Sequence, residues 1–123
     1  MTYVANAEWT KVSKNLTGDT FYVDLERTKK HDGKVYFWQL ADYFKPYKYG
    51  NISVGMMSFK TYVEAECGRF RFRYLSGTSY KGSMGTGTVI TSANTPDKDW
   101  SYPSPNSAGE FKLKAVCNHK SMK

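Results

Sequence analysis

The stretch Arg69-Phe-Arg-Phe-Arg-Tyr74 alternates a basic residue with an aromatic residue at every position. Successive side chains of a β-strand point to opposite faces of the sheet, so this alternation predicts a strand with one aromatic and one basic face. The aromatic side chains are expected to face the core: Phe70, Phe72 and Tyr74. The basic side chains are expected to face solvent or a partner: Arg69, Arg71 and Arg73.

Similar segments, rich in aromatic and β-branched residues and separated by Gly, Asn and Asp, lie on both sides of this stretch. They predict antiparallel strands over Glu8–Lys14, Thr20–Thr28, Lys34–Lys45, Ser53–Cys67, Arg69–Tyr80 and Thr88–Ser92. The Asp32-Gly33 pair favours a tight turn, and Pro46–Asn51 is expected to be a polar connection. Gly55 is expected to permit a bulge.

The C-terminal part changes character and predicts a helix. Ser107-Ala-Gly-Glu110 has the capping-box pattern, in which the serine and glutamate side chains satisfy exposed backbone donors. A helix is therefore expected from about Ala108 to Asn118. The expected fold class is α+β: a single antiparallel β-sheet of about six strands with a C-terminal α-helix packed on it.

Length and composition limit the class of protein. The chain has 123 residues, which suits one domain, and 40% of them are hydrophobic, which is enough for a packed core. No apolar run approaches the roughly 20 residues that a membrane-spanning helix needs. Residues 1–7 are expected to be a tail or the remnant of a signal peptide, residues 8–118 the single domain, and residues 119–123 a C-terminal tail.

The net charge of +7 favours an anionic partner: nucleic acid, sulfated glycan, an anionic lipid surface or an acidic protein. Between Cys67 and Pro96 there are four basic residues and no acidic residue. We expect these four to form a basic binding surface: Arg69, Arg71, Arg73 and Lys81. A solvated sheet face is the alternative explanation.

Ala5-Asn6-Ala7 fits the small-x-small pattern at the end of a secretory signal, and an ordinary N-terminal tail is the alternative. The chain has two cysteines, Cys67 and Cys117. In an oxidising compartment they would most simply pair with each other, whereas in the cytosol they would be free thiols.

No pattern for catalysis or metal binding is found. The two histidines, His31 and His119, lack metal-ligand spacing, and Gly82–Gly87 lacks the ending of a phosphate loop. A ribonuclease would need a general acid–base pair, for which Glu64 and Glu66 could meet the arginines on a neighbouring strand. Carboxylates beside arginines on a sheet more often form cross-strand pairs, so we expect no enzyme, no metal and no cofactor.

The order of features along the chain resembles the surface-adhesin protein E family of Gram-negative bacteria. The resembling pieces are Trp9, Tyr22-Val-Asp24 followed by Arg27, Asp42-Tyr43, Cys67 before the arginine-bearing strand, Tyr80 leading into Met84-Gly-Thr-Gly87, Trp100 before prolines, and Val116-Cys117. The resemblance covers roughly Glu8 to Cys117.

The resemblance implies an antiparallel sheet whose C-terminal helix is tied to it by a Cys67–Cys117 disulfide. It also implies export to the periplasm, the cell surface or the medium, and binding to host matrix proteins such as vitronectin and laminin. Dimerisation is a further implication, whereas a cofactor and catalysis are not expected. The family's adhesin is lipid-anchored through an N-terminal cysteine, and this sequence has none before Cys67.

Together these observations predict a non-catalytic exported domain that binds a matrix protein or a polyanionic glycan through a basic sheet face. A small nucleic-acid-binding or nucleolytic domain is the first alternative, although inward-facing aromatic rings make nucleic acid a less favoured partner. A structural envelope protein that dimerises through an open sheet edge is the second alternative.

Overall fold

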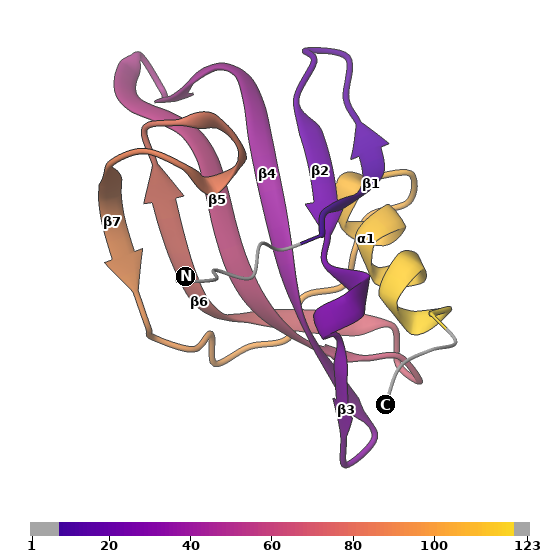
Figure 1. Cartoon of the computed structure of the whole chain (residues 1–123). Helices are drawn as coiled ribbons and strands as arrows, with labels where there is room; N and C mark the ends of the chain where they lie inside the picture. Colours follow the sequence, from indigo (N-terminus) through magenta and orange to yellow (C-terminus); the bar gives the residue numbers. More distant parts are fainter. Residues whose placement is uncertain (1–7, 120–123) are drawn as a thin grey trace, which may run out of the picture.

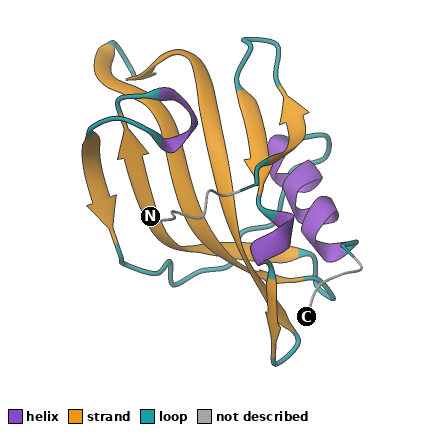
Figure 2. Cartoon of the chain, in the orientation of Figure 1, coloured by secondary structure: helices purple, strands orange, loops and turns teal. Residues whose placement is uncertain are grey.

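The computed structural model describes residues 8–119, so the expectations for residues 1–7 and 120–123 lie outside the described part. Within residues 8–119 the chain forms seven strands and one α-helix (Figure 1). The strands are β1 (Thr10–Lys14), β2 (Thr20–Val23), β3 (Lys29–His31), β4 (Lys34–Tyr49), β5 (Ile52–Glu66), β6 (Arg71–Tyr80) and β7 (Val89–Ala93). Two short 3₁₀ helices, η1 (Leu25–Arg27) and η2 (Ser83–Gly85), and the helix α1 (Ala108–Cys117) complete the fold (Figure 2).

All strands belong to one antiparallel sheet in the order β1-β2-β4-β5-β6-β7, and β3 pairs with the start of β4. The expected fold class is therefore confirmed, with seven strands in place of about six. The centre of the sheet is the long β4–β5 hairpin, which can be followed through the middle of Figure 1. Strands that are neighbours in the described sheet also follow one another in the chain, except that η1 and β3 lie between β2 and β4.

The additional strand exists because the expected strand Thr20–Thr28 is interrupted. The Asp24 side chain accepts a hydrogen bond from the Arg27 backbone nitrogen at 3.3 Å, which caps the 3₁₀ helix η1. Asp and Asn side chains accept hydrogen bonds from nearby backbone N–H groups, which stabilises a turn in place of pairing between strands. The strand therefore ends at Val23, and the chain rejoins the sheet as β3.

The expected polar connection over Pro46–Asn51 is mostly strand. β4 continues to Tyr49, which pairs with Ile52, and its register against β5 shifts between Asp42 and Tyr47 and again between Tyr47 and Lys48. Pro46 lies in this irregular part, where its missing backbone N–H costs no ladder hydrogen bond. Gly55 has a φ of +71°, as expected for the irregularity proposed there.

Strand β6 begins at Arg71 and not at Arg69, because Phe70 has a φ of +52° in the turn that follows Cys67. Phe70 and Phe72 pack against the buried core as expected, whereas Tyr74 remains 37% exposed. The ring of Tyr74 nevertheless lies on the same side, with its centroid 5.6 Å from that of Phe72, so the alternation gave the correct face for all three aromatic rings. Tyr74 lies at the margin of the region that the helix covers, where it lines a gap with Lys112 and Leu113 of α1.

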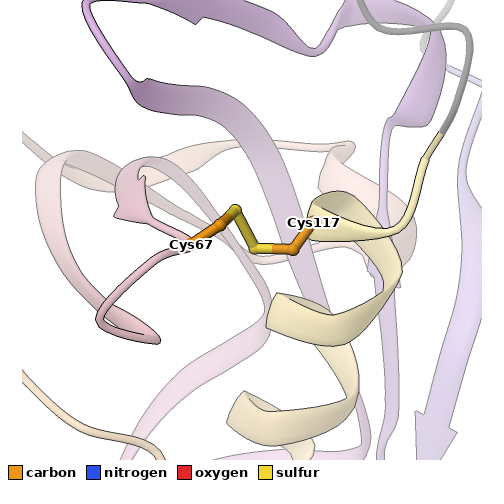
Figure 3. The surroundings of a disulfide bond; sticks show 2 residues. All are labelled: Cys67 and Cys117. Atoms are coloured by element: carbon orange, nitrogen blue, oxygen red, sulfur yellow. A yellow bond between two sulfur atoms is a disulfide. The ribbon is translucent and has the colours of Figure 1, made fainter.

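Helix α1 begins as the capping box predicts, with Ser107 Oγ accepting a hydrogen bond from the Glu110 backbone nitrogen. Leu113 and Val116 are its buried residues, and they join one core cluster with Val35, Phe37 and Val63 of the sheet. The Cys67–Cys117 disulfide ties the last turn of α1 to the end of β5 (Figure 3). This pairing confirms the disulfide expectation.

Because residues alternate between the two sides, the sheet has a second face opposite α1. Part of this face is covered by the β6–β7 loop, where Ser58 Oγ donates to the Gly82 carbonyl and accepts from the Gly85 nitrogen. The loop also buries Leu40 completely. We call the remainder the open face; its residues include Tyr36, Trp38, Lys60, Tyr62, Glu64, Glu66, Arg71 and Arg73.

Candidate binding face

Arg71 and Arg73 lie at one end of the open face, and Arg69 lies beside them in the turn before β6. Arg71 Nε donates a hydrogen bond to Glu66 Oε1 at 2.7 Å, and Arg69 Nε lies 3.7 Å from the same oxygen. Arg73 Nε donates to Glu64 Oε1 from the adjacent position of the ladder. The two carboxylates therefore meet the arginines as the cross-strand pairs that the sequence favours.

A tryptophan from the C-terminal part completes this cluster. Trp100 stacks on both guanidinium groups, with its ring centroid 4.5 Å from Cζ of Arg71 and 4.8 Å from Cζ of Arg73. Its neighbour Ser101 exchanges two backbone hydrogen bonds with Phe72, which hold the segment against β6. The term arginine cluster is used below for Arg69, Arg71 and Arg73 with Glu64, Glu66 and Trp100.

Sequence reasoning missed Trp100 as a site residue. Its partners are about thirty positions away in the sequence, and a single Trp in a proline-containing loop is compatible with many positions. The nearest sequence signal is the set of three tryptophans in so short a chain. A planar guanidinium stacks well on an aromatic face. The stacking leaves the edge of the guanidinium, where its N–H donors lie, accessible to anions.

Glu64 is buried, and its environment keeps it ionised. Burial opposes ionisation, but the hydrogen bond from Tyr36 Oη at 2.8 Å and the hydrogen bond and charge of Arg73 outweigh it. The pKa of Glu64 is therefore held below its usual value, while the same hydrogen bond raises the pKa of Tyr36. A carboxyl held ionised in this way is a poor general acid.

The segment between Cys67 and Pro96 contains no acidic residue, but acidic side chains of the neighbouring strand lie against its arginines. Glu64 and Glu66 of β5 neutralise two of the three arginine charges, and one net positive charge remains on the cluster. Arg69 carries the most accessible guanidinium, since 70% of its side chain is exposed. A polyanion that binds here would meet Arg69 first.

The structure does not bring Lys81 to this cluster. Lys81 follows the last residue of β6, whereas Arg71 is the first. At about 3.3 Å per residue, the two positions are roughly 30 Å apart. The four expected basic residues therefore occupy two separate places.

Aromatic rings continue the open face away from the arginine cluster. The rings of Trp38 and Tyr62 lie 4.7 Å apart, and those of Tyr36 and Tyr62 lie 6.3 Å apart. Lys60 Nζ lies 5.4 Å from the ring centroid of Trp38 and 5.7 Å from that of Tyr80. This half of the face combines flat apolar surface with a cation, a composition that is common in binding surfaces.

The described residues offer charged and aromatic side chains that can contact a partner, and no cluster of metal ligands. Within residues 8–119, no three His, Cys, Asp or Glu side chains lie close enough together to hold a metal ion. His31 lies 3.2 Å from Asp32 in the exposed β3–β4 turn, and His119 follows α1. None of the described helices is long and apolar enough to cross a membrane.

The fold and this face define a small sheet-and-helix domain that presents a partly charged, partly aromatic surface. The sequence profile of the surface-adhesin protein E family matches residues 9–118, so the chain belongs to that family of adhesin-like surface proteins. No curated protein sequence matches the chain.

Solved structures of Haemophilus influenzae protein E share the fold. One crystal form superposes with a TM-score of 0.68 at 16% identity, and the match covers 97% of this chain and 94% of that one. The protein E structure from a non-typeable strain gives a TM-score of 0.63 at 17% identity, covering 95% of this chain and 79% of that one. At such low identity these matches show the shared fold alone.

Proposed function

We propose that this chain is a non-catalytic binding domain of an exported bacterial surface protein, and that its arginine cluster contacts an anionic macromolecule. The preferred partners are a host matrix protein, such as vitronectin or laminin, and a polyanionic glycan. Family membership supports the adhesin class. The observation that carries the choice of site is the stacking of Arg71 and Arg73 on Trp100, which fixes two guanidinium groups beside the exposed Arg69.

The test measures binding of the oxidised protein to immobilised laminin, vitronectin and heparin at physiological salt. The double variant R69Q/R71Q removes two charges from the cluster and leaves Arg73 paired with the buried Glu64. The matched control is K11Q/K14Q, which removes two exposed charges from the edge strand β1. We expect R69Q/R71Q to lose at least about fivefold in affinity and the control to change by less than about twofold. Equal losses in both variants would show that only net charge matters.

Lys81 receives a separate test, because the fold separates it from the arginines. K81Q weakens binding only if the partner also reaches the β6–β7 loop. A partner that spans both places would have to extend over roughly 30 Å, the length of β6. Loss of binding in K81Q together with R69Q/R71Q would therefore indicate an extended partner, and loss in R69Q/R71Q alone a compact contact.

A dimerising envelope protein is the second candidate function, and one observation favours it. In the described part of the sheet, β7 is an edge strand whose Val89 is 48% exposed. Unpaired edges with apolar residues favour pairing with another chain. Light scattering across a concentration series tests this, and a mass that stays that of the monomer would exclude it.

A further inference from the structure

A recessed site lies on the open face, away from the arginine cluster. Trp9, just before β1, and Trp38 of β4 form aromatic walls, and Lys60 of β5 lies beside them. Asp24 and Arg27 from the η1 turn complete the lining. The hollow encloses about 120 Å³ and opens to solvent. We call it the Trp9–Trp38 hollow.

The buried carboxylate of Asp24 is incompletely satisfied. Its Oδ1 accepts the η1 capping hydrogen bond, and its side chain is 1% exposed. Oδ2 accepts no hydrogen bond from the described residues, and Arg27 Nε lies 3.5 Å away. A buried carboxylate oxygen without a donor is costly, and an added O–H donor would relieve that cost.

The charges around the hollow favour an anionic ligand. Arg27 and Lys60 contribute two positive charges against the single carboxylate of Asp24. None of the ion pairs found within residues 8–119 involves Lys60, whose ammonium group instead lies over the rings of Trp38 and Tyr80. A ligand carboxylate could therefore take Lys60 as its partner without breaking an existing ion pair.

The presence of two tryptophans among the lining residues favours a ligand with an apolar face and polar edges. A pyranose ring presents C–H bonds on its face and hydroxyl groups around its rim, so its face packs on aromatic rings while its rim forms hydrogen bonds. A ring of this size fits a shallow hollow of about 120 Å³. A bare phosphate or sulfate group would leave the indole faces unused.

We propose that the Trp9–Trp38 hollow binds one hexuronate unit of an acidic glycan. The C–H face of the sugar lies against the indoles, the sugar carboxylate pairs with Lys60, and a hydroxyl group reaches Asp24 Oδ2 after a small displacement of Arg27. This inference rests on the proposed function, because it names the partner chemistry of the same face. It assigns the contact to residues outside the arginine cluster.

The probe is an oligosaccharide of alternating hexuronate and N-acetylhexosamine, titrated calorimetrically into the full chain at physiological salt. A neutral N-acetylhexosamine oligosaccharide of equal length is the ligand control. We expect saturable binding of the acidic probe only, with K60Q and W9A each weakening it at least about fivefold. K30Q, an exposed charge change on β3, is the protein control and is expected to bind like the parent chain.

Several outcomes would overturn this assignment. These are equal binding of the neutral probe, no binding at all, or full binding by both K60Q and W9A. Loss of the acidic probe in R69Q/R71Q but not in K60Q would place the glycan on the arginine cluster, which rejects the hollow and keeps the proposed function. Loss in K60Q and W9A, with normal matrix-protein binding by R69Q/R71Q, would keep the hollow and reject the arginine cluster as the adhesive site. Thermal unfolding of each variant verifies that it is folded.

Discussion

Glu64 illustrates how single residues set the stability of the open face. It is 5% exposed in β5, and Tyr36 and Arg73 donate hydrogen bonds to its two oxygens. Removing one partner from a buried ion pair leaves a charge without compensation, which costs about 3 kcal/mol. Exposed pairs such as Arg69 with Glu66 contribute about 0.5 kcal/mol or less.

We therefore predict that R73Q lowers the free energy of unfolding by about 3 kcal/mol, whereas R69Q lowers it by about 0.5 kcal/mol or less. Urea unfolding monitored by tryptophan fluorescence measures both values. Equal effects of the two variants would show that Glu64 is well solvated. The result also matters for binding studies, because loss of binding in R73Q could reflect unfolding.

The low pKa of Glu64 makes stability depend on pH. A carboxyl group whose folded pKa is below its unfolded value contributes stability above the unfolded pKa of about 4.3, and that stability is lost as the pH falls through the folded pKa. We predict that the parent chain loses stability below about pH 4.3 and that E64Q shows a smaller loss. Melting temperatures measured between neutral and acidic pH test this. An unchanged acid profile in E64Q would contradict it.

Lys112 has the opposite kind of environment. Its side chain lines a small gap between α1 and the sheet with Phe37 and Tyr74, and its Nζ lies 5.4 Å from the ring centroid of Phe21. Burial lowers the pKa of Lys112 to about 8. A lysine whose folded pKa is lowered costs no stability above its unfolded pKa of about 10.4, where it is neutral in both states. The folded protein loses stability as the pH falls from there towards the folded pKa.

We predict that K112M stabilises the protein by about 2 kcal/mol at pH 7, because methionine fills the same gap without a charge. The gain should shrink between about pH 8 and about pH 10.4, where the parent lysine becomes neutral. Unfolding in urea at several pH values measures the difference. A gain that does not depend on pH would show that packing alone explains it.

At the scale of secondary-structure elements, the disulfide holds the short helix on the sheet. Helix α1 has ten residues, and helices of this length are marginal by themselves. Cys67 and Cys117 are 50 positions apart. Closing a loop of that length lowers the conformational entropy of the unfolded chain, which stabilises the folded protein by about 4 kcal/mol in the chain-entropy model. The capping hydrogen bond at Ser107 acts at the other end of the helix.

We predict that C67A/C117A lowers the free energy of unfolding by about 4 kcal/mol. The expected loss is largest in the contacts of α1 with β1 and β2, which should become visible as faster hydrogen exchange in the helix. Chemical denaturation of the oxidised, reduced and substituted chains measures the effect. A loss below about 1 kcal/mol would show that the core contacts of Leu113 and Val116 are sufficient.

At the scale of the whole molecule, the charge of +7 and the arginine cluster act over different distances. Exposed charges far from a bound partner are screened at physiological salt, whereas charges in contact with it are screened much less. We predict that K11Q/K14Q weakens heparin binding at about 0.01 M salt but not at about 0.15 M salt. R69Q/R71Q should weaken it at both. Binding of the parent chain that disappears at about 0.15 M salt would mean that the charge acts generically.

Much of the fold follows from local sequence patterns. Alternation identified the sheet and its buried side, the Ser107 capping box identified the start of the helix, and the resemblance implied the disulfide. The errors occurred where a local interaction competes with strand pairing. Asp24 caps a 3₁₀ turn within an expected strand, and the β4–β5 ladder resumes past Pro46 after its register has shifted.

The candidate sites depended on contacts that no local pattern encodes. Alternation places the arginines on one face, but only the register of β5 against β6 brings Glu64 and Glu66 opposite them. The chain segment after β7 must fold back before Trp100 can stack on the guanidinium groups.

By itself, then, the sequence determined the sheet, its inward face and the position of the helix, because these depend on periodicity and capping within a few residues. Tertiary structure alone decided that Lys81 lies apart from the arginines and that Trp9, Asp24 and Trp38 share one hollow. The physical reason is that strand length and register fix distances between residues far apart in the chain, and these depend on the packing of the whole sheet.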